Sequence, residues 1–328
     1  FMSGFKIEDY LIDYAQNEGI ASTLCSYHKN FIGGVDSGVL PKAAMSVTTS
    51  MICDGNINTF RHMEQKHQVE SYVLDIPNTY SPEAERYVVG QLQELIELLE
   101  TKTGQMLDMN ELQAAIQREN ESKEYYKAFL KEQKHRYYPN TMTLDLYMLF
   151  ASHLNIGTQE TLDFFKCLAE DVKTYPEFDG KGILWVHLMP YYQETLQQYM
   201  NYQEKYYIQA CDLNLDYMEP LNAAHPLEAL AKKMILNIYN GPYERKVEMI
   251  RHLVKEFQSD AVIHFCHWGC KQSSGGVMLL KEAMREENVP MLILDGDALD
   301  RRNSHDGQIK TRLQAFLELI DNIEEDKD

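Results

Sequence analysis

The second half of the chain alternates strand-like runs with helical runs, and this alternation constrains the fold more than any other feature of the sequence. The apolar runs are ILWVHLMP, YYIQACDL, AVIHFC and PMLILDGD, and helically spaced runs such as YERKVEMIRHLVKEF and GQIKTRLQAFLELI lie between and after them. Regular alternation of this kind predicts an α/β domain with a parallel sheet covered by helices on both faces, as in flavodoxin- or Rossmann-like folds. In such sheets, ligands bind at the carboxyl ends of the strands.

The first half of the chain predicts further parallel strands and a helical insertion. The run AMSVTTSMICDGN has the pattern of a strand that ends at Cys53, ESYVLDIPNTY has that of a second strand, and Ser81 with Pro82 marks the start of a helix. From Asp108 to about Lys173 nearly all of the sequence has helical spacing. Its Tyr and Phe residues recur on one face, which indicates core packing.

The loop YPEFDGKG concentrates Pro, Gly and charge at residues 175–182 and predicts a domain boundary. We therefore predict two α/β domains with parallel sheets. Residues 1–176 form the first, which includes the helical insertion, and residues 177–328 form the second.

Composition excludes several classes of protein. Hydrophobic residues make up 44% of the 328 residues and charged residues 25%, which is typical of a folded globular protein. The 50 acidic and 31 basic side chains give a formal net charge of -19, which disfavours nucleic acid and anionic membranes as partners. No apolar run approaches the roughly 20 residues that cross a bilayer, so we predict a cytoplasmic protein.

The stretch HFCHWGCKQSSGG, residues 264–276, lies where a predicted strand gives way to a loop, and three interpretations compete for it. Cys266 and Cys270 have the C-x3-C spacing of a zinc site, although a closed site needs four ligands. Residues 273–276 could bind an anion through backbone N–H groups at the start of a helix. Alternatively, Cys25, Cys53 and Cys270 could converge from separate loops on an iron–sulfur cluster.

Spacing alone does not choose among these interpretations, because an isolated cysteine is usually a buried packing residue. Cys167 and Cys211 lie in apolar helical and strand patterns, and we predict that both belong to the core. Cys266 lies inside an apolar strand, and its contribution to a site stays open. His267 and Trp268 flank Cys270 and could hydrogen-bond or shield a cluster, although packing roles are the simpler interpretation.

Three segments resemble one known family. The run from VIHFCHWGCKQSSGG through VPMLILDGD to QIKTRLQAFLELI resembles the C-terminal segment of the 2-hydroxyacyl-CoA dehydratase and benzoyl-CoA reductase family, in particular its 2-hydroxyglutaryl-CoA dehydratase D-component type of subunit. STLCSYHKN and SVTTSMICDGN resemble the two N-terminal cysteine segments of that family, so the resemblance extends from about residue 18 to the end. It implies that Cys25, Cys53 and Cys270 bind a 4Fe-4S cluster with one iron free of protein thiolate.

The resemblance also implies a reaction and partners. In this family, an ATP-dependent iron–sulfur activator passes one electron to the dehydratase, and a 2-hydroxyacyl-CoA loses water through a ketyl radical to give a 2-enoyl-CoA. The expected partner is a related dehydratase subunit in a heterodimer, with a homodimer as the alternative. Family members usually carry a further α/β segment before the first cysteine, whereas about twenty residues precede Cys25 here. Because the chain begins with Phe1, we expect a truncated or processed N-terminus, or a partner that supplies the missing part.

Two other functions stay open at this stage. One is a 4Fe-4S reductase or electron-transfer protein of the same superfamily, which dependence on a CoA thioester would distinguish. The other is a scaffold whose cysteines are merely buried, which predicts a colourless protein without iron.

Overall fold

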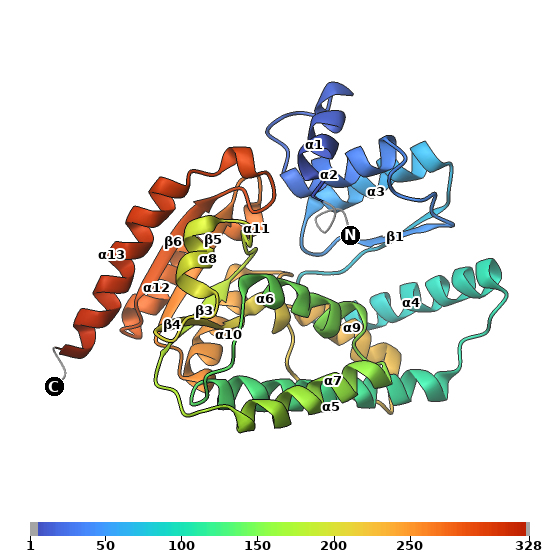
Figure 1. The fold of residues 1–328 in the computed structure, drawn as a ribbon. Coiled ribbons are helices and arrows are strands. Elements are labelled where there is room, and N and C mark those ends of the chain that lie inside the picture. Colours follow the sequence, from blue (N-terminus) through green and yellow to red (C-terminus); the bar gives the residue numbers. More distant parts are fainter. Residues whose placement is uncertain (1–5, 326–328) are drawn as a thin grey trace.

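A computed structural model describes residues 6–325, with side chains described as far as residue 322. The protein is an α/β protein with two parallel sheets, as the sequence predicts (Figure 1). The larger sheet has the strand order β4-β3-β5-β6, all parallel, with bounds β3 Lys181–Val186, β4 Tyr206–Cys211, β5 Ala261–His267 and β6 Met291–Gly296. The smaller sheet pairs β1, Ser46–Thr49, with β2, Ser71–Leu74.

Helices make up most of the remaining structure. Their bounds are α1 Glu8–Asn17, α2 Ser26–Asp36, α3 Asp54–His67, α4 Pro82–Thr103, α5 Met109–Gln133, α6 Met142–Leu149, α7 Gln159–Asp171, α8 Glu194–Met200, α9 Pro226–Leu236, α10 Tyr243–Phe257, α11 Lys271–Ser274, α12 Val277–Glu286 and α13 Asp306–Glu325. A π-helical turn, η2, covers Phe150–Leu154, and short 3-10 turns are η3 Val172–Thr174, η4 Asp212–Asn214 and η5 Arg301–Asn303. None of the helices within residues 6–325 combines the length and apolar character that crossing a membrane requires.

Two helix starts show how local sequence sets these bounds. Ser81 caps α4 by accepting a hydrogen bond from the backbone N–H of Ala84, and Pro82 occupies the first turn, where its missing N–H is harmless. Thr141 caps α6 in the same way through Leu144. Helix α10 begins and ends where its amphipathic pattern predicts.

One strand end differs from the prediction. Strand β1 ends at Thr49, so the prediction that Cys53 ends this strand is wrong. The partner strand β2 stops at Leu74, and the last backbone hydrogen bond between the two segments runs from Ser50 N, directly after β1, to the Leu74 carbonyl. Beyond that point the chain turns, and Cys53 becomes the residue that precedes α3.

The larger sheet is covered on both faces, and each face has its own apolar core. Helices α8 and α13 pack on one face, where Trp185, Phe265 and Leu313 are fully buried. Helices α10 and α12 pack on the other face around Leu184 and Val262. The alternation of side chains along each strand sends neighbours to opposite faces, which explains why these strands are apolar throughout.

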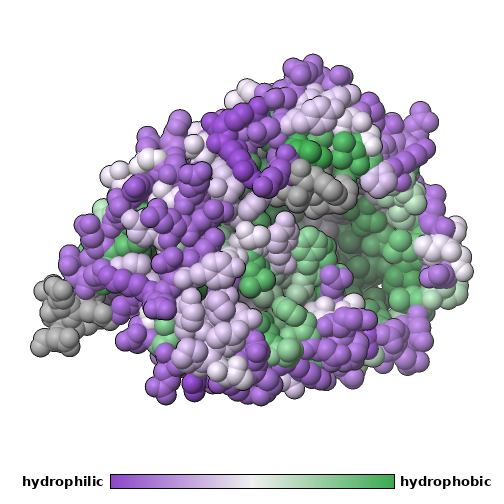
Figure 2. Space-filling model, viewed as in Figure 1, coloured by the Kyte–Doolittle hydropathy of each residue, from purple (hydrophilic) through white to green (hydrophobic). Residues whose placement is uncertain are grey.

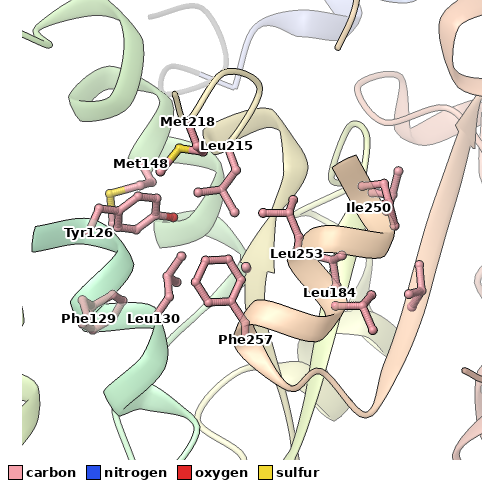
Figure 3. Close-up of a cluster of buried hydrophobic side chains, with 14 of the residues drawn as sticks. Tyr126, Phe129, Leu130, Met148, Leu184, Leu215, Met218, Ile250, Leu253 and Phe257 are labelled. Atoms are coloured by element: carbon pink, nitrogen blue, oxygen red, sulfur yellow. The ribbon is translucent and has the colours of Figure 1, made fainter. Parts of the chain in front are cut away.

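The helical segment α5–α7 shares the second of these cores. Tyr126, Phe129 and Leu130 of α5 meet Leu253 and Phe257 of α10 (Figure 3). Core packing is thereby confirmed for the buried aromatic residues of this region, whereas Tyr147, Phe150 and Phe164 are exposed. The predicted boundary between residues 176 and 177 stays a prediction, and across it these helices and the sheet form one continuous core.

The connections between strands reverse direction at the centre of the larger sheet. From β3 the chain crosses through α8 on one face to β4, whereas from β5 it crosses through α12 on the opposite face to β6. Strands β3 and β5 are neighbours whose following connections run to opposite faces of the sheet, which is the arrangement at which doubly wound sheets usually bind ligands. Figure 2 shows a predominantly polar surface that is hollowed between the part formed by α1 to α3 and the helices α4 and α9.

Candidate functional site

The candidate site lies at the carboxyl ends of β3 and β5, where the strand connections reverse. His187 is the first residue after β3, His267 is the last residue of β5, and Cys270 follows three residues later. In the segment α1–α3, Cys25 and Cys53 occupy corresponding positions directly before α2 and α3. Each of the three cysteines is thus the N-cap residue of a helix, and in none of them does the side chain cap the helix.

The six cysteines divide by exposure. Cys25, Cys53 and Cys270 are half-buried, whereas Cys211 and Cys266 are buried. Cys167 is exposed, so the prediction that it belongs to the core is wrong. Helix α7 buries its face containing Leu162, Phe165 and Leu168 and turns Cys167 outward.

A glycine brings the segments of Cys25 and Cys270 into contact. Gly269 has a left-handed φ of +77, and a Cβ at this position would lie 3.0 Å from the backbone nitrogen of Cys25. Only glycine combines that backbone conformation with so close an approach. Two residues that are 245 positions apart in sequence are therefore held together, and the negative charge of Cys270 raises the pKa of Cys25 as a minor effect beside burial.

Cys53 joins the same region through His28. The Nε2 atom of His28 lies 3.4 Å from the Sγ atom of Cys53, and Nδ1 lies 2.9 Å from the Oγ1 atom of Thr59. A Cβ at Gly55 would lie 2.6 Å from His28 Nε2, so the start of α3 also fits closely against this ring.

Each half-buried cysteine faces a different histidine. The Nε2 atom of His267 lies 3.2 Å from Cys25 Sγ, that of His28 lies near Cys53, and that of His187 lies 3.6 Å from Cys270 Sγ. Burial lowers the pKa of His267 to about 4 and also lowers the pKa of His28 and of His187. All three imidazoles are therefore neutral near pH 7.

Two residues beside the cysteines have a backbone conformation that is rare for their type. Ile52, directly before Cys53, has φ 72, and His187 has φ 77. Positive φ is costly for a residue with a Cβ, and for a β-branched residue it is an outlier. Such strain is held in place by the surrounding structure and gathers at functional sites.

Asp212 holds the strained residue His187. Its Oδ1 atom accepts the backbone N–H of His187 at 2.6 Å, and its Oδ2 atom accepts the hydroxyl of Tyr239 at 2.7 Å. The ammonium of Lys246 lies 3.0 Å from Oδ2, and both charged side chains are fully buried. The angles of this contact do not meet those of a hydrogen bond, so it is an ion pair only. The ammonium also lies 4.3 Å from the ring centre of Tyr239.

A second carboxylate organises the loop after β6. Asp297 accepts the hydroxyl of Ser26 at 2.6 Å and the backbone N–H groups of Leu299 and Asp300. The acidic stretch DGDALD is therefore a turn in which Asp297 is bonded by the turn's own backbone and by α2, whereas Asp295 is bonded by Arg312 and Asp300 by Arg302. It also presents the backbone N–H of Ala298 to Nδ1 of His267 at 3.0 Å.

The alternative interpretations of the HFCHWGC stretch find less support. Within residues 6–325 no group of three or more His, Cys, Asp or Glu side chains is arranged to hold a single metal ion. Cys266 points to the opposite side of β5 from His267, with its Sγ atom 3.7 Å from Nδ1 of His264. The hydroxyl of Ser273 bonds to backbone groups of His267 and Cys270, so this turn already uses its polar atoms internally.

The three half-buried cysteines suit a cluster better than a single ion. Thiolate sulfur is the ligand that iron–sulfur clusters take, and a cluster of several irons spreads its protein ligands farther apart than one ion does. The three thiols come from three separate segments and are neither fully exposed nor sealed in the core. Their assignment as cluster ligands stays a prediction.

Burial raises the pKa of Cys25 to about 11, while the backbone N–H groups of Tyr27 and His28 in the first turn of α2 lower it. The same burial would favour binding a cation to this sulfur over leaving a free thiolate. Helix N-termini attract negative charge, and α2 and α3 direct theirs at Cys25 and Cys53.

The sequence argument did not identify His28 or His187 as site residues. Both histidines stand at sequence positions that could have identified them as site residues. His28 lies three residues after Cys25, which is one helical turn, and His187 follows a buried strand directly.

Comparison with known proteins identifies the family of the chain. A family model described as 2-hydroxyglutaryl-CoA dehydratase, D-component, matches residues 1–320. The chain is 25% identical to the (R)-phenyllactyl-CoA dehydratase alpha subunit of Clostridium sporogenes, over 94% of this chain and 80% of that protein. It is 20% identical to the lactoyl-CoA dehydratase subunit alpha of Anaerotignum propionicum, over 95% and 82%, and 23% identical to the (R)-2-hydroxyisocaproyl-CoA dehydratase alpha subunit of Clostridioides difficile, over 95% and 81%. The resemblance seen in the cysteine segments is thereby confirmed over nearly the whole chain, and the chain belongs to the 2-hydroxyglutaryl-CoA dehydratase D-component family.

Proposed function

We propose that this chain is a subunit of a 2-hydroxyacyl-CoA dehydratase, a hydro-lyase that removes water from a 2-hydroxyacyl-CoA and gives a 2-enoyl-CoA. The hydroxyl leaves from C2 and a proton leaves from C3, so substrate and product differ by one water and no net electrons. Three relatives named as alpha subunits of such dehydratases support the reaction class.

The observation that supports the proposal is that three half-buried cysteines each precede a helix and each lie beside a different histidine, while Gly269 brings the segment of Cys270 against Cys25. Cys25, Cys53 and Cys270 would hold a 4Fe-4S cluster. When bound, the cluster would supply single-electron reduction of the thioester and one iron free for a substrate oxygen. This chemistry suits the reaction because the C3 proton is only weakly acidic until the thioester has been reduced.

The chain's own residues would contribute position and electrostatics. The N-termini of α2 and α3 direct partial positive charge at the two N-terminal thiolates. Buried His187 and His267 lie beside the sulfurs of Cys270 and Cys25 and would keep bulk water from them. Gly269 fixes the separation between the segments of Cys25 and Cys270.

The proposed partners follow from the family. The name "alpha subunit" in the relatives implies a second subunit, and we propose a related chain in a heterodimer, with a homodimer as the alternative. We also propose that an ATP-dependent iron–sulfur activator supplies the starting electron. The acyl group is left open, because the relatives act on different 2-hydroxyacyl chains according to their names.

The test is iron and acid-labile sulfide content with the visible spectrum, measured on anaerobically purified protein. The matched variants are Cys270→Ser and Cys167→Ser, since Cys167 is exposed on α7. We expect about four irons per chain in the wild type and in Cys167→Ser, and loss of iron and of the absorption near 400 nm in Cys270→Ser. Iron-free wild type would reject the proposal, and zinc in place of iron would favour a different metal site.

Catalysis is then tested with the cluster-loaded chain, its partner and the activator. Formation of 2-enoyl-CoA from a 2-hydroxyacyl-CoA supports the dehydratase. Electron transfer without dependence on a CoA thioester would favour a reductase of the same superfamily.

A further inference from the structure

Resting on the proposed cluster, we propose that His267, His28 and His187 are positioning residues that donate N–H···S hydrogen bonds to Cys25, Cys53 and Cys270 and thereby raise the reduction potential of the cluster. The three contacts are Nε2 to Sγ distances of 3.2, 3.4 and 3.6 Å. Each sulfur has its own histidine, and the three rings come from three different elements.

The tautomer of His267 is fixed by its other nitrogen. The backbone N–H of Ala298 donates to Nδ1 at 3.0 Å, so Nδ1 must be the nitrogen without a proton. The proton of the neutral ring is therefore on Nε2, which faces Cys25 Sγ. Asp297 accepts the backbone N–H groups of Leu299 and Asp300 and the hydroxyl of Ser26 in α2. These hydrogen bonds hold the turn that contains Ala298, so contacts from both segments set the direction in which Nε2 of His267 points.

The other two rings have the same arrangement with different support. Thr59 bonds to Nδ1 of His28, and its hydroxyl can serve as donor or acceptor. Nδ1 of His187 is buried and has no hydrogen-bond partner within residues 6–325, which leaves Cys270 as the only hydrogen-bonding contact of that ring there. The backbone N–H of His187 donates a hydrogen bond to Asp212, and this bond holds the strained φ that sets the direction of the ring.

The expected effect follows from electrostatics. A hydrogen bond donated to a ligand sulfur stabilises the more electron-rich state, so it raises the reduction potential. The effect is larger where water is excluded, and His267 and His187 are only 1% and 4% exposed. The reaction needs an electron to pass to the thioester and return, so the potential must lie within a limited range.

The experiment compares variants after anaerobic reconstitution with ferrous iron and sulfide, by iron content and by redox titration followed by EPR. His267→Leu removes the donor, whereas His267→Gln keeps an N–H donor. His28→Leu is a second variant at a half-buried position, where folding is less at risk. His252→Leu is the control, since His252 is exposed and pairs only with Glu256 on α10.

We expect full iron content in all four variants. At a fixed potential, the ratio of reduced to oxidised cluster should fall about tenfold in His267→Leu and in His28→Leu, which is about 59 mV for a one-electron couple. It should stay near the wild-type value in His267→Gln and His252→Leu. Full iron with an unchanged ratio in both His267→Leu and His28→Leu would overturn this inference and leave the proposed function standing, whereas absence of iron in the wild type would overturn both.

Discussion

Asp212→Asn removes the charge that balances the buried Lys246 ammonium while keeping the size of the side chain. Both side chains are fully buried and their charged atoms lie 3.0 Å apart. The asparagine can still accept the backbone N–H of His187 through Oδ1. Its amide nitrogen takes the place of Oδ2, so the hydroxyl of Tyr239 must change from donor to acceptor, and the substitution then removes the charge while both neighbours keep a hydrogen-bond partner.

The magnitude can be estimated from this separation. At 3.0 Å and an effective dielectric constant of about 20, the attraction is about 5.5 kcal/mol. Desolvation of both ions offsets part of it, and removal of one partner from a buried pair costs about 3–5 kcal/mol. We expect a loss of about that size in the free energy of unfolding.

Urea unfolding followed by circular dichroism measures this loss. The double variant Asp212→Asn with Lys246→Met carries no unpaired charge, so we expect it to be more stable than Asp212→Asn alone. Glu83→Gln is the control, since its pair with Arg86 is exposed and should contribute less than about 1 kcal/mol.

A loss below about 1 kcal/mol at neutral pH, or a double variant no more stable than Asp212→Asn, would refute the reasoning.

Three further predictions concern the site and the cysteines. Burial lowers the pKa of His264 to about 3, below about 6.5 in the unfolded chain, so His264 by itself should contribute a loss of about 1.4 kcal/mol of stability per pH unit in the metal-free protein as the pH falls from 6.5 towards 3. Urea midpoints at several pH values should show a smaller slope in His264→Gln, and an equal slope would contradict this. Gly269→Ala places a Cβ 3.0 Å from the backbone nitrogen of Cys25, whereas a Cβ at Gly38, with φ +75, meets nothing within 4 Å. We expect Gly38→Ala to lower the free energy of unfolding by about 1 kcal/mol through backbone conformation alone. Gly269→Ala should lower it more and should also reduce iron binding. In the metal-free protein one thiol should react rapidly with Ellman's reagent and disappear in Cys167→Ser, because Cys167 is the exposed cysteine; an unchanged fast phase would contradict its placement.

Much of the fold could be predicted because the signals are local. The bounds of α10 follow from its amphipathic period, and the start of α4 follows from Ser81 and Pro82. The four strands of the larger sheet were each present as a short apolar run closed by polar residues. These features depend on residues within a few turns of one another, so the sequence alone carries them.

The positions of two cysteines depend on contacts between distant segments, so local sequence patterns could not predict them. Cys53 could not be placed after the end of β1, because the length of that strand depends on where its partner β2 stops. Cys167 lies in an apolar helical pattern, but the face of α7 that is buried is chosen by α5 and the sheet core. Periodicity predicts that a helix has two faces and does not say which partner will cover each one.

For the site, the sequence determined the residue types and their helix-preceding or strand-following positions, and its resemblance to a family singled out Cys25, Cys53 and Cys270. The tertiary structure alone decided that β3 and β5 are neighbours, so that His187 lies beside Cys270 although the two are far apart in sequence. It also decided which nitrogen of His267 faces Cys25, because the Ala298 amide that fixes it comes from the loop after β6. The physical reason is that strand order and hydrogen-bond pairing depend on contacts between distant segments, which no local pattern of residues encodes.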